Sequence, residues 1–280
     1  MHSIHIFFLA FLLTTASFGQ NKLQSAKESI SKSSPRSQGG KRGSSDSKSN
    51  RNYDRYDSYQ TSFASNFIED ILYQVTWGMV RGMLFEAYGE RMSRHSKAGL
   101  TTYPYAEGQQ GDFDFYNTEK TARFAIENNY LTSSTIKGNY LKGELNFAKR
   151  ISLTGDFLYM NEKLFRGGKT NYRQYTVMAN YYRIRTPKIS VWYGLGARYV
   201  GEEVDTYGFA YNFGMRLFLK KPLSFETVFT GSVIDVNPVN QFDAKLKWHR
   251  NKLFLTTGYN HVNINGTHFN QLSLGLGTYF

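Results

Sequence analysis

The chain ends on LSLGLGTYF, residues 272–280, and this stretch decides the fold. Apolar side chains occupy every second position, Leu272, Leu274 and Leu276, and the last residue is Phe280. Because successive side chains of a β-strand point to opposite faces, this spacing gives one apolar face and one face of small or polar residues. The apolar face of such a strand meets a protein core in a soluble sheet and lipid in a bilayer.

The same period of two extends back to about residue 121. It is clearest over residues 206–217, where Tyr207, Phe209, Tyr211 and Phe213 alternate with small or polar residues. Ten such segments are recognisable, and the hairpin over residues 121–148 is the least regular, so eight strands are the alternative. The ten ranges are 121–131, 139–148, 151–160, 172–183, 189–200, 205–218, 223–234, 240–249, 252–263 and 267–280.

An alternating final strand with a terminal Phe resembles the small outer-membrane β-barrels of Gram-negative bacteria. Thr278 departs from their pattern, which usually has an apolar residue there. The resemblance implies an antiparallel up-and-down transmembrane barrel over residues 119–280, porin-like in architecture, and names no activity. It also implies contact with outer-membrane lipids and with the barrel-insertion machinery, which would read Leu272, Leu274, Leu276 and Phe280.

Composition agrees with a barrel. Only 40% of the 280 residues are apolar, and no segment after residue 20 is apolar for the roughly 20 residues of a transmembrane helix. Barrel strands need only about 9 to 11 residues each and show lipid one face. The 21 Tyr and 22 Phe suit aromatic girdles at the two interfaces. The predicted interface aromatics are Phe147, Tyr159, Tyr199, Tyr207, Trp248 and Tyr259.

The N-terminal part reads as an export signal followed by a linker. Residues 4–13 are apolar and small residues follow, which predicts a signal peptide over residues 1–19; an apolar N-terminal helix is the alternative. Residues 20–64 are rich in Ser, Lys, Arg, Gly and Asn, which predicts a disordered basic linker. The chain has no Cys, so it has neither a lipoprotein anchor nor a disulfide.

Residues 65–92 are predicted to form one amphipathic helix, because apolar residues recur there at helical spacing. Its charges make a bilayer-spanning position costly, so it is expected on a surface, at the barrel mouth or in the inner interface. Residues 93–118 connect it to the barrel. The net charge is +12, of which the tail over residues 20–57 carries +5, and export argues against nucleic acid as its partner. The tail and helix are expected to touch the periplasm or the cell wall, or to act as a spacer.

Charges on the inward face are expected to close the lumen. A soluble sandwich or lipocalin-like barrel would carry such charges outside, and ten strands enclose little more than side chains. Lys245 and Lys247 beside Asp243, opposite Glu226, are the best candidates for a network. The predicted lumen charges are Arg123, Glu127, Lys142, Glu144, Asp156, Arg198, Arg216, Glu226, Asp243, Lys245 and Lys247.

The connections predict the orientation. Those of one mouth are short, whereas 134–138, 161–171 and 201–204 are mostly longer, as outer loops are. With an even number of strands, the first and last residues of the barrel segment would then lie in the periplasm, as would the N-terminal tail. Residues 161–171 would be the most prominent outer loop.

Three functions are compatible with these features. The first is a structural, envelope-stabilising or loop-presenting barrel, the second a narrow channel for ions or small solutes, and the third an outer-membrane enzyme acting on lipid or peptide. His261 and His268 are the candidate catalytic residues, but the Asp-x-His pattern of omptin proteases is absent and Asn stands where lipid A deacylases have Ser. No enzyme, cofactor or metal is therefore expected.

Overall fold

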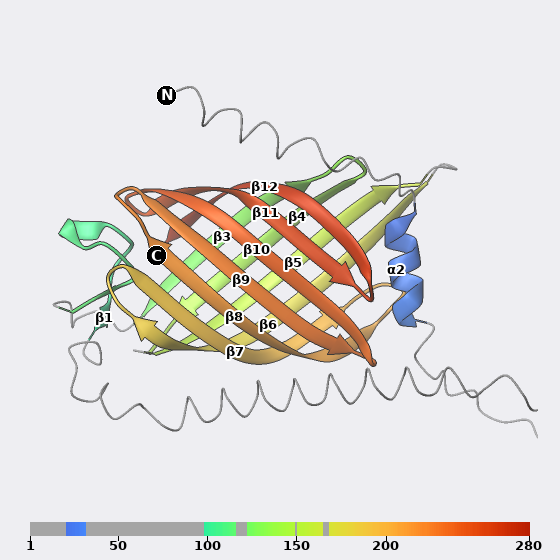
Figure 1. Cartoon of the computed structure of the whole chain (residues 1–280), viewed down its shortest axis with the longest axis horizontal. Coiled ribbons are helices and arrows are strands. Elements are labelled where there is room, and N and C mark those ends of the chain that lie inside the picture. The colour runs from blue at the N-terminus through green and yellow to red at the C-terminus, as the bar shows by residue number, and fades with distance from the viewer. Residues whose placement is uncertain (1–20, 32–97, 116–121, 149, 165–167) are drawn as a thin grey trace, which may run out of the picture.

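The computed structural model describes residues 21–31, 98–115, 122–148, 150–164 and 168–280. Ten of its strands close into one antiparallel barrel, in which every strand pairs with its neighbours in the chain (Figure 1). The ten strands are β3 (Arg123–Thr132), β4 (Ile136–Asn146), β5 (Ile151–Lys163), β6 (Lys169–Arg185), β7 (Ile189–Val200), β8 (Thr206–Phe218), β9 (Leu223–Ile234), β10 (Asn237–Arg250), β11 (Leu253–Ile264) and β12 (Thr267–Tyr279).

The last strand closes the barrel on the first. β12 pairs with β3 from Leu272 opposite Thr132 to Tyr279 opposite Ala125. The Phe280 amide then donates a hydrogen bond of 2.8 Å to the Phe124 carbonyl oxygen. The first hairpin, β3 with β4, pairs along its whole length, so the ten-strand prediction is confirmed and the eight-strand alternative is wrong.

The two faces of the wall follow the predicted parity. Leu274 on β12 is 68% exposed and Phe213 on β8 is 53% exposed, whereas Arg216 and Glu226 inside the barrel are nearly fully buried. A soluble barrel has the opposite arrangement, with its apolar side chains inside. The outer wall is therefore suited to lipid, as the sequence predicted.

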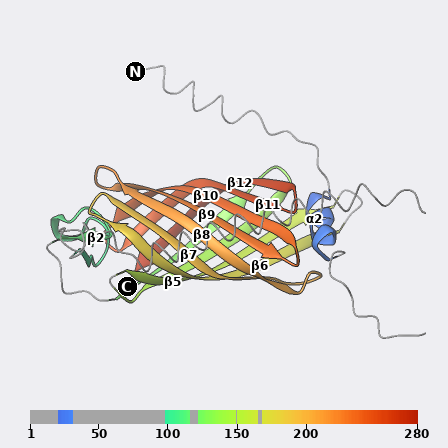
Figure 2. The same cartoon turned by 60° about the horizontal axis from the view of Figure 1, so that its bottom comes forward.

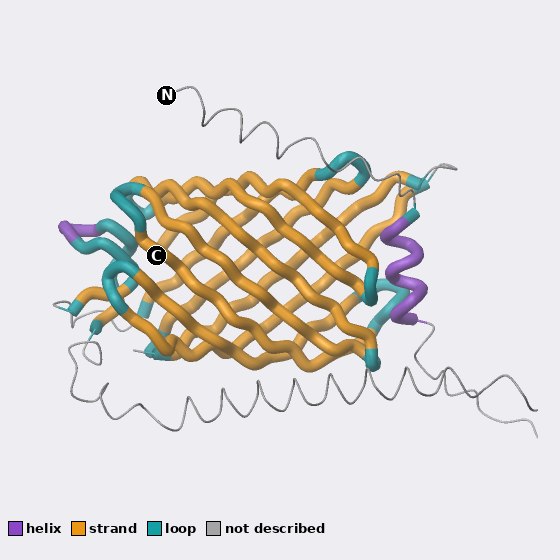
Figure 3. The backbone as a smooth tube through the Cα atoms, viewed as in Figure 1, coloured by secondary structure: helices purple, strands orange, loops and turns teal. Residues whose placement is uncertain are grey.

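The wall needs small residues where lumen side chains are large. A Cβ added at Gly214 on β8 would lie 2.2 Å from the indole of Trp192 on β7. The inward position of Gly214 therefore makes room for an aromatic ring that fills the lumen. Figure 3 shows how the strands tilt across the long axis of the barrel.

The prediction of a long loop over 161–171 is wrong. β5 continues to Lys163 and β6 begins at Lys169, and Asn161 pairs with Asn171 in the sheet. Strand pairing over this hairpin satisfies backbone groups that a loop would leave to water, which outweighs the low β-propensity of Asn. Every connection at this mouth is therefore short.

We call the barrel end where β3 begins and β12 ends the terminal mouth, and the opposite end the helix mouth. The described helix, α2 (Lys22–Ser31), lies across the helix mouth (Figures 1 and 2). It falls within residues 20–64, for which the sequence predicted a disordered linker, so that prediction fails for these ten residues. The signal peptide (1–19), the rest of the linker and the predicted helix over 65–92 lie outside the described residues.

Residues 98–115 cover the terminal mouth. They form the short strands β1 (Gly99–Leu100) and β2 (Phe113–Asp114), paired with each other, and one 3₁₀ turn, η2 (Ala106–Gly108). The sequence predicted only a connection here. In the described part of the chain, no helix is long and apolar enough to cross a membrane.

Candidate functional site

The candidate site is the filled lumen, and its half nearest the terminal mouth is charged. Glu226 on β9 is at the centre, only 2% exposed. Its carboxylate meets three cations: Arg216 on β8 at 2.5 Å, Lys142 on β4 at 3.1 Å and Lys247 on β10 at 3.1 Å. Charges can be buried in this way only when opposite charges compensate them at close range.

A second carboxylate extends the same network. Glu127 on β3 accepts hydrogen bonds from Lys245 at 2.7 Å and from Lys247 at 2.6 Å. Lys247 thus joins Glu127 to Glu226. The sequence placed both lysines beside Asp243, but Asp243 is held by amides instead, Gln241 at 3.0 Å and Asn260 at 2.6 Å.

Asp112 is a member of the network that the sequence did not suggest. It comes from the segment over the terminal mouth, where it forms ion pairs with Arg123 (2.6 Å) and with Arg216. Arg216 also meets Glu144 at 3.2 Å. Residue 112 lies outside the alternating strand pattern, so its role cannot be recognised from the sequence.

Other contacts fix the covering segment to the barrel. The Phe113 ring packs edge-on against Tyr182 with centroids 5.2 Å apart, and Arg185 donates a 2.8 Å hydrogen bond to the Ala98 carbonyl oxygen. The Tyr105 hydroxyl donates to the Leu223 carbonyl oxygen at 2.5 Å. Burial, and then the nearby carboxylate of Asp112, raise the pKa of Tyr105 to about 12, so the hydroxyl stays a donor at neutral pH. Residues 98–115 thus cover the terminal mouth and are bonded to the barrel wall.

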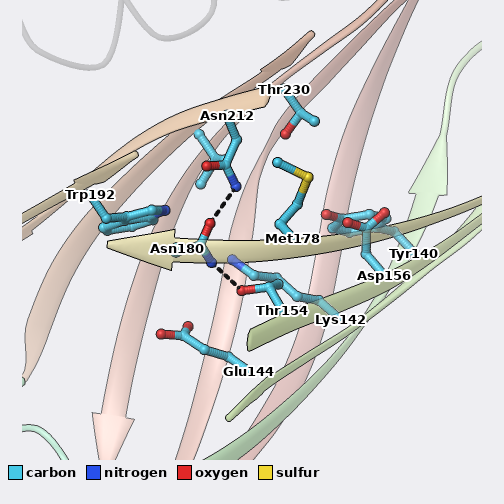
Figure 4. Close-up of a pocket in the computed structure, with 11 residues that line it drawn as sticks. Tyr140, Lys142, Glu144, Thr154, Asp156, Met178, Asn180, Trp192, Asn212 and Thr230 are labelled. Atoms are coloured by element: carbon cyan, nitrogen blue, oxygen red, sulfur yellow. Dashed lines mark hydrogen bonds between the residues drawn. The ribbon is translucent and has the colours of Figure 1, made fainter. Parts of the chain in front are cut away.

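Neutral polar side chains fill the middle of the lumen. Asn180 accepts a hydrogen bond from Asn212 (2.9 Å) and donates one to Thr154 (2.7 Å), as Figure 4 shows. The cavity beside them, also lined by Asp156 and Trp192, measures about 20 Å³, and another near Glu127 about 10 Å³. Each volume is close to that of one water molecule, so neither forms a path through the barrel.

Arg198 on β7 is the charged residue closest to the helix mouth among the predicted lumen set. Its guanidinium donates to the Ser232 hydroxyl at 3.1 Å and to the Val239 carbonyl oxygen at 2.9 Å. All eleven predicted lumen charges therefore point inward, and Arg198, Asp156 and Asp243 lie outside the ion-pair cluster. Alternation predicts the inward face of all eleven, and the predicted proximity of Lys247 to Glu226 is confirmed, whereas Asp243 is bonded to amides.

The half of the lumen nearest the helix mouth is apolar. Strand residues converge there and α2 adds three apolar side chains, all fully buried, at helical spacing: Leu23, Ala26 and Ile30. This apolar cup is formed by Leu131, Ile136, Tyr140, Leu158, Met160, Tyr172, Val200, Val204, Ile234, Val239, Val262, Ile264 and Phe269.

Polar contacts hold α2 in the cup. The buried Glu162 carboxylate accepts hydrogen bonds from the backbone amides of Leu23 (2.8 Å) and Lys22 (3.3 Å) at the start of the helix. A carboxylate satisfies unpaired amides there and interacts favourably with the helix dipole. Lys27, on the same buried face of α2 as Leu23, reaches Glu203 at 3.2 Å. α2 is thus docked by both charge and apolar surface.

One serine–histidine contact lies inside the wall. The Ser224 hydroxyl is 2.7 Å from Nε2 of His249. Both side chains are buried, the Tyr105 ring covers His249 at 5.6 Å, and Nδ1 of His249 has no hydrogen-bond partner. A catalytic nucleophile–base pair needs access for substrate and a group that orients the base. This pair meets neither requirement.

The predicted interface aromatics lie on the outer wall. Tyr199 contacts Tyr207 with ring centroids 4.8 Å apart and Tyr175 at 6.0 Å, which makes a row of rings toward the helix mouth. Phe147 and Trp248 are exposed toward the terminal mouth. Leu272, Leu274, Leu276 and Phe280 are exposed on the wall as well, and their reading by the insertion machinery stays a prediction.

A closed barrel with an apolar outer wall, aromatic rows near its ends and charges inside is a membrane β-barrel of the Gram-negative outer-membrane type. The chain is therefore a small integral outer-membrane β-barrel. No protein family matches it, and no curated protein does.

Several solved outer-membrane structures are similar to the chain. Ail, the attachment invasion locus protein of Yersinia pestis, is 15% identical, with 56% of this chain and 99% of Ail covered and a TM-score of 0.33. An outer membrane channel of Pseudomonas putida is 12% identical, with 59% and 98% covered and a TM-score of 0.36. OprG of Pseudomonas aeruginosa is 16% identical, with 57% and 97% covered and a TM-score of 0.30. The chain is classed as an outer-membrane barrel on the surface of its own wall and not on these similarities.

Proposed function

We propose that this barrel is closed and that its role is structural: it stabilises the envelope and presents its outer end for interaction. The observation that carries the proposal is the filling of the lumen, in which the two cavities near the charges have volumes of only about 20 and 10 Å³. Segments over both mouths support it further. Because the connections at the helix mouth are short, the surfaces presented for interaction would be the β5–β6 hairpin and α2, and not long loops.

Conductance across a planar bilayer tests the proposal. The full chain should insert without discrete current steps, while an open porin measured under the same conditions gives them. Steady steps from the wild-type chain would support the alternative, a narrow channel. Heat-dependent mobility on a detergent gel should be measured on the same sample, so that a silent bilayer is not the result of an unfolded barrel.

The proposal includes no catalytic activity. The buried Ser224–His249 pair lacks access, and His261 and His268 face outward, away from the lumen. Wild-type protein should therefore not hydrolyse phospholipid or peptide substrates above the blank. Hydrolysis that disappears in His261→Ala or His268→Ala would establish the enzyme alternative.

Lipids are the proposed partners of the wall. A surface groove of about 470 Å³ lies on the outer face toward the helix mouth, where a leaflet would place its headgroups. Its lysines and amides are groups that suit phosphate and hydroxyl oxygens. The groove is lined by Tyr130, Lys137, Gly138, Asn139, Tyr159, Asn161, Lys169 and Asn171. Contacts with the insertion machinery, and of the basic tail with the cell wall, stay predictions.

We place the start of β3 and the end of β12, and so the terminal mouth, in the periplasm. α2 then lies at the outer mouth, because it docks at the opposite end of the barrel (Figure 2). The predicted periplasmic location of the tail therefore does not hold for α2 in this orientation. For residues 32–64 it stays a prediction.

Single cysteines can decide the side, because the chain has none of its own. Ser25 on α2, Ser134 at the helix mouth and Asn251 at the terminal mouth are all exposed. On intact cells, a membrane-impermeant maleimide should label Ser25→Cys and Ser134→Cys but not Asn251→Cys. Labelling of Asn251→Cys alone would reverse the orientation, and labelling of Ser134→Cys without Ser25→Cys would contradict the docking of α2.

A further inference from the structure

Two histidines that the sequence treats as unrelated meet on the outer wall of the last hairpin. His261 lies on β11 and His268 on β12, and the register places them diagonally on one face, with the pair Val262–Phe269 between their own pairs. Their rings lie 5.3 Å apart between centroids, and Nδ1 of His268 is 3.3 Å from Nε2 of His261. The hairpin turn creates this proximity, which spacing along the chain does not reveal.

The orientation of His261 is fixed by its other nitrogen. Nδ1 of His261 is 2.6 Å from Oδ1 of Asn270, and the Tyr259 hydroxyl donates to the same oxygen at 2.8 Å. An oxygen that accepts from Tyr259 also accepts from His261, so Nδ1 of His261 carries the proton. Its Nε2 therefore presents a lone pair toward His268. A histidine whose second nitrogen donates to a carbonyl oxygen is the usual arrangement of a metal ligand.

The nitrogen separation suits a metal ion. Two imidazole nitrogens, each about 2.0 to 2.1 Å from a tetrahedral zinc ion, lie about 3.3 Å from each other. We propose that His261 and His268 form a bidentate surface site for a late first-row divalent metal, Zn²⁺, Cu²⁺ or Ni²⁺, for which imidazole is a preferred ligand.

Binding needs only a change of tautomer. In the metal-free pair, Nδ1–H of His268 donates to the lone pair of Nε2 of His261. On binding, this proton moves through solvent to Nε2 of His268, and the metal takes both lone pairs. No net proton is released. Two protein ligands leave the other coordination positions to water or to a donor outside the barrel, because the site faces outward.

The expected consequence is a clamp on the hairpin that closes the barrel. The metal would join β11 to β12 close to their turn, where the Asn263 side chain already accepts a 2.9 Å hydrogen bond from the Gly266 amide. Asn270 acts as a positioning residue, because it touches His261 and not the metal.

Calorimetric titration of the full chain in detergent, without a polyhistidine tag, tests the proposal with Zn²⁺ and Ni²⁺ alone as probes. Wild type should bind one metal ion per chain. His261→Ala and His268→Ala should each weaken binding at least tenfold, and Asn270→Ala should weaken it about 10- to 100-fold while both ligands remain.

His249→Gln is the matched control, since His249 is buried on the lumen side of the wall, where its Nε2 lies 2.7 Å from the Ser224 hydroxyl, and takes no part in the site. It should bind as wild type does. Gel mobility before and after boiling establishes that each variant is folded, and both site histidines are on the surface, so the variants should pass. Absence of binding by wild type, or undiminished binding by the double variant His261→Ala/His268→Ala, would overturn the proposal.

Discussion

The two halves of the lumen are filled in different ways. Toward the terminal mouth, Glu127, Glu144, Glu226 and Asp112 share their cations so closely that Arg216 alone serves three carboxylates. Toward the helix mouth, aliphatic and aromatic side chains pack against α2. Ion pairs depend on specific partners, whereas apolar packing depends on volume, so the two halves should respond to substitution differently.

The largest effect is expected from Glu226→Leu in the charged half. The substitution leaves the cations of Arg216, Lys142 and Lys247 close together without their common carboxylate. Removing one partner of a buried ion pair typically costs about 3 to 5 kcal/mol. Denaturant unfolding of the barrel in lipid vesicles, together with heat-dependent gel mobility, measures the loss.

A second substitution shows whether charge is the cause. Lys142 has its ion pair with Glu226, so Glu226→Leu/Lys142→Met removes both members of one pair. The double variant should be clearly more stable than the sum of the single effects implies. Strict additivity would mean that lost packing, not unpaired charge, destabilises Glu226→Leu.

A smaller effect is expected from Leu131→Ala in the apolar half. Leu131 is fully buried, and truncation of such a leucine costs about 2 to 5 kcal/mol. We expect the lower end, because α2 can shift toward the cavity. Leu131→Met, which conserves volume, should cost less than about 1.5 kcal/mol in the same unfolding measurement. Equal losses from both variants would contradict the dependence on volume.

Glu162→Gln tests the junction between α2 and the apolar half. The amide keeps one accepting oxygen but loses the charge at the helix start, which is worth about 1 kcal/mol. Trypsin should then cleave after Lys22 or Lys27 faster than in wild type, while barrel unfolding stays unchanged. Unaltered cleavage would show that apolar contact alone holds α2.

The smallest effect is expected from Glu203→Gln. Its carboxylate is 54% exposed where it meets the buried Lys27, and Glu202 stays 4.0 Å from the same ammonium, so the expected loss is that of an exposed ion pair, about 0 to 1 kcal/mol. Trypsin cleavage of α2 should change by less than it does in Glu162→Gln. A larger change would mean that the Lys27 contact, and not the helix start, is the main anchor.

Sequence periodicity predicts well which face of the wall a strand residue occupies, and it predicts poorly which lumen charges pair with one another. Alternation placed Glu127 and Lys245 inside and Leu274 outside, because the side of a strand is a local property. Which carboxylate meets which lysine depends on barrel closure, which brings β10 and β3 within reach of each other across the lumen. The pairing of Glu127 with Lys245, in place of Asp243, could therefore not be predicted.

Segments outside the barrel strands were the hardest to predict. α2 has apolar residues at helical spacing, but its composition is that of a linker, and the cup that stabilises it is assembled from distant strands. Asp112 lies in a segment with no period at all, and its role is set by Arg123 and Arg216. In both cases long-range contacts decide the structure and local propensity does not.

The position of α2 links its docking to the closure of the barrel. The apolar cup takes Leu131 from β3 and Phe269 from β12, the two strands that meet at the seam, so the surface that α2 covers is complete only when these strands are paired. Whatever stabilises the closed seam therefore also stabilises the docked helix, and the docked helix stabilises the seam by the same free energy.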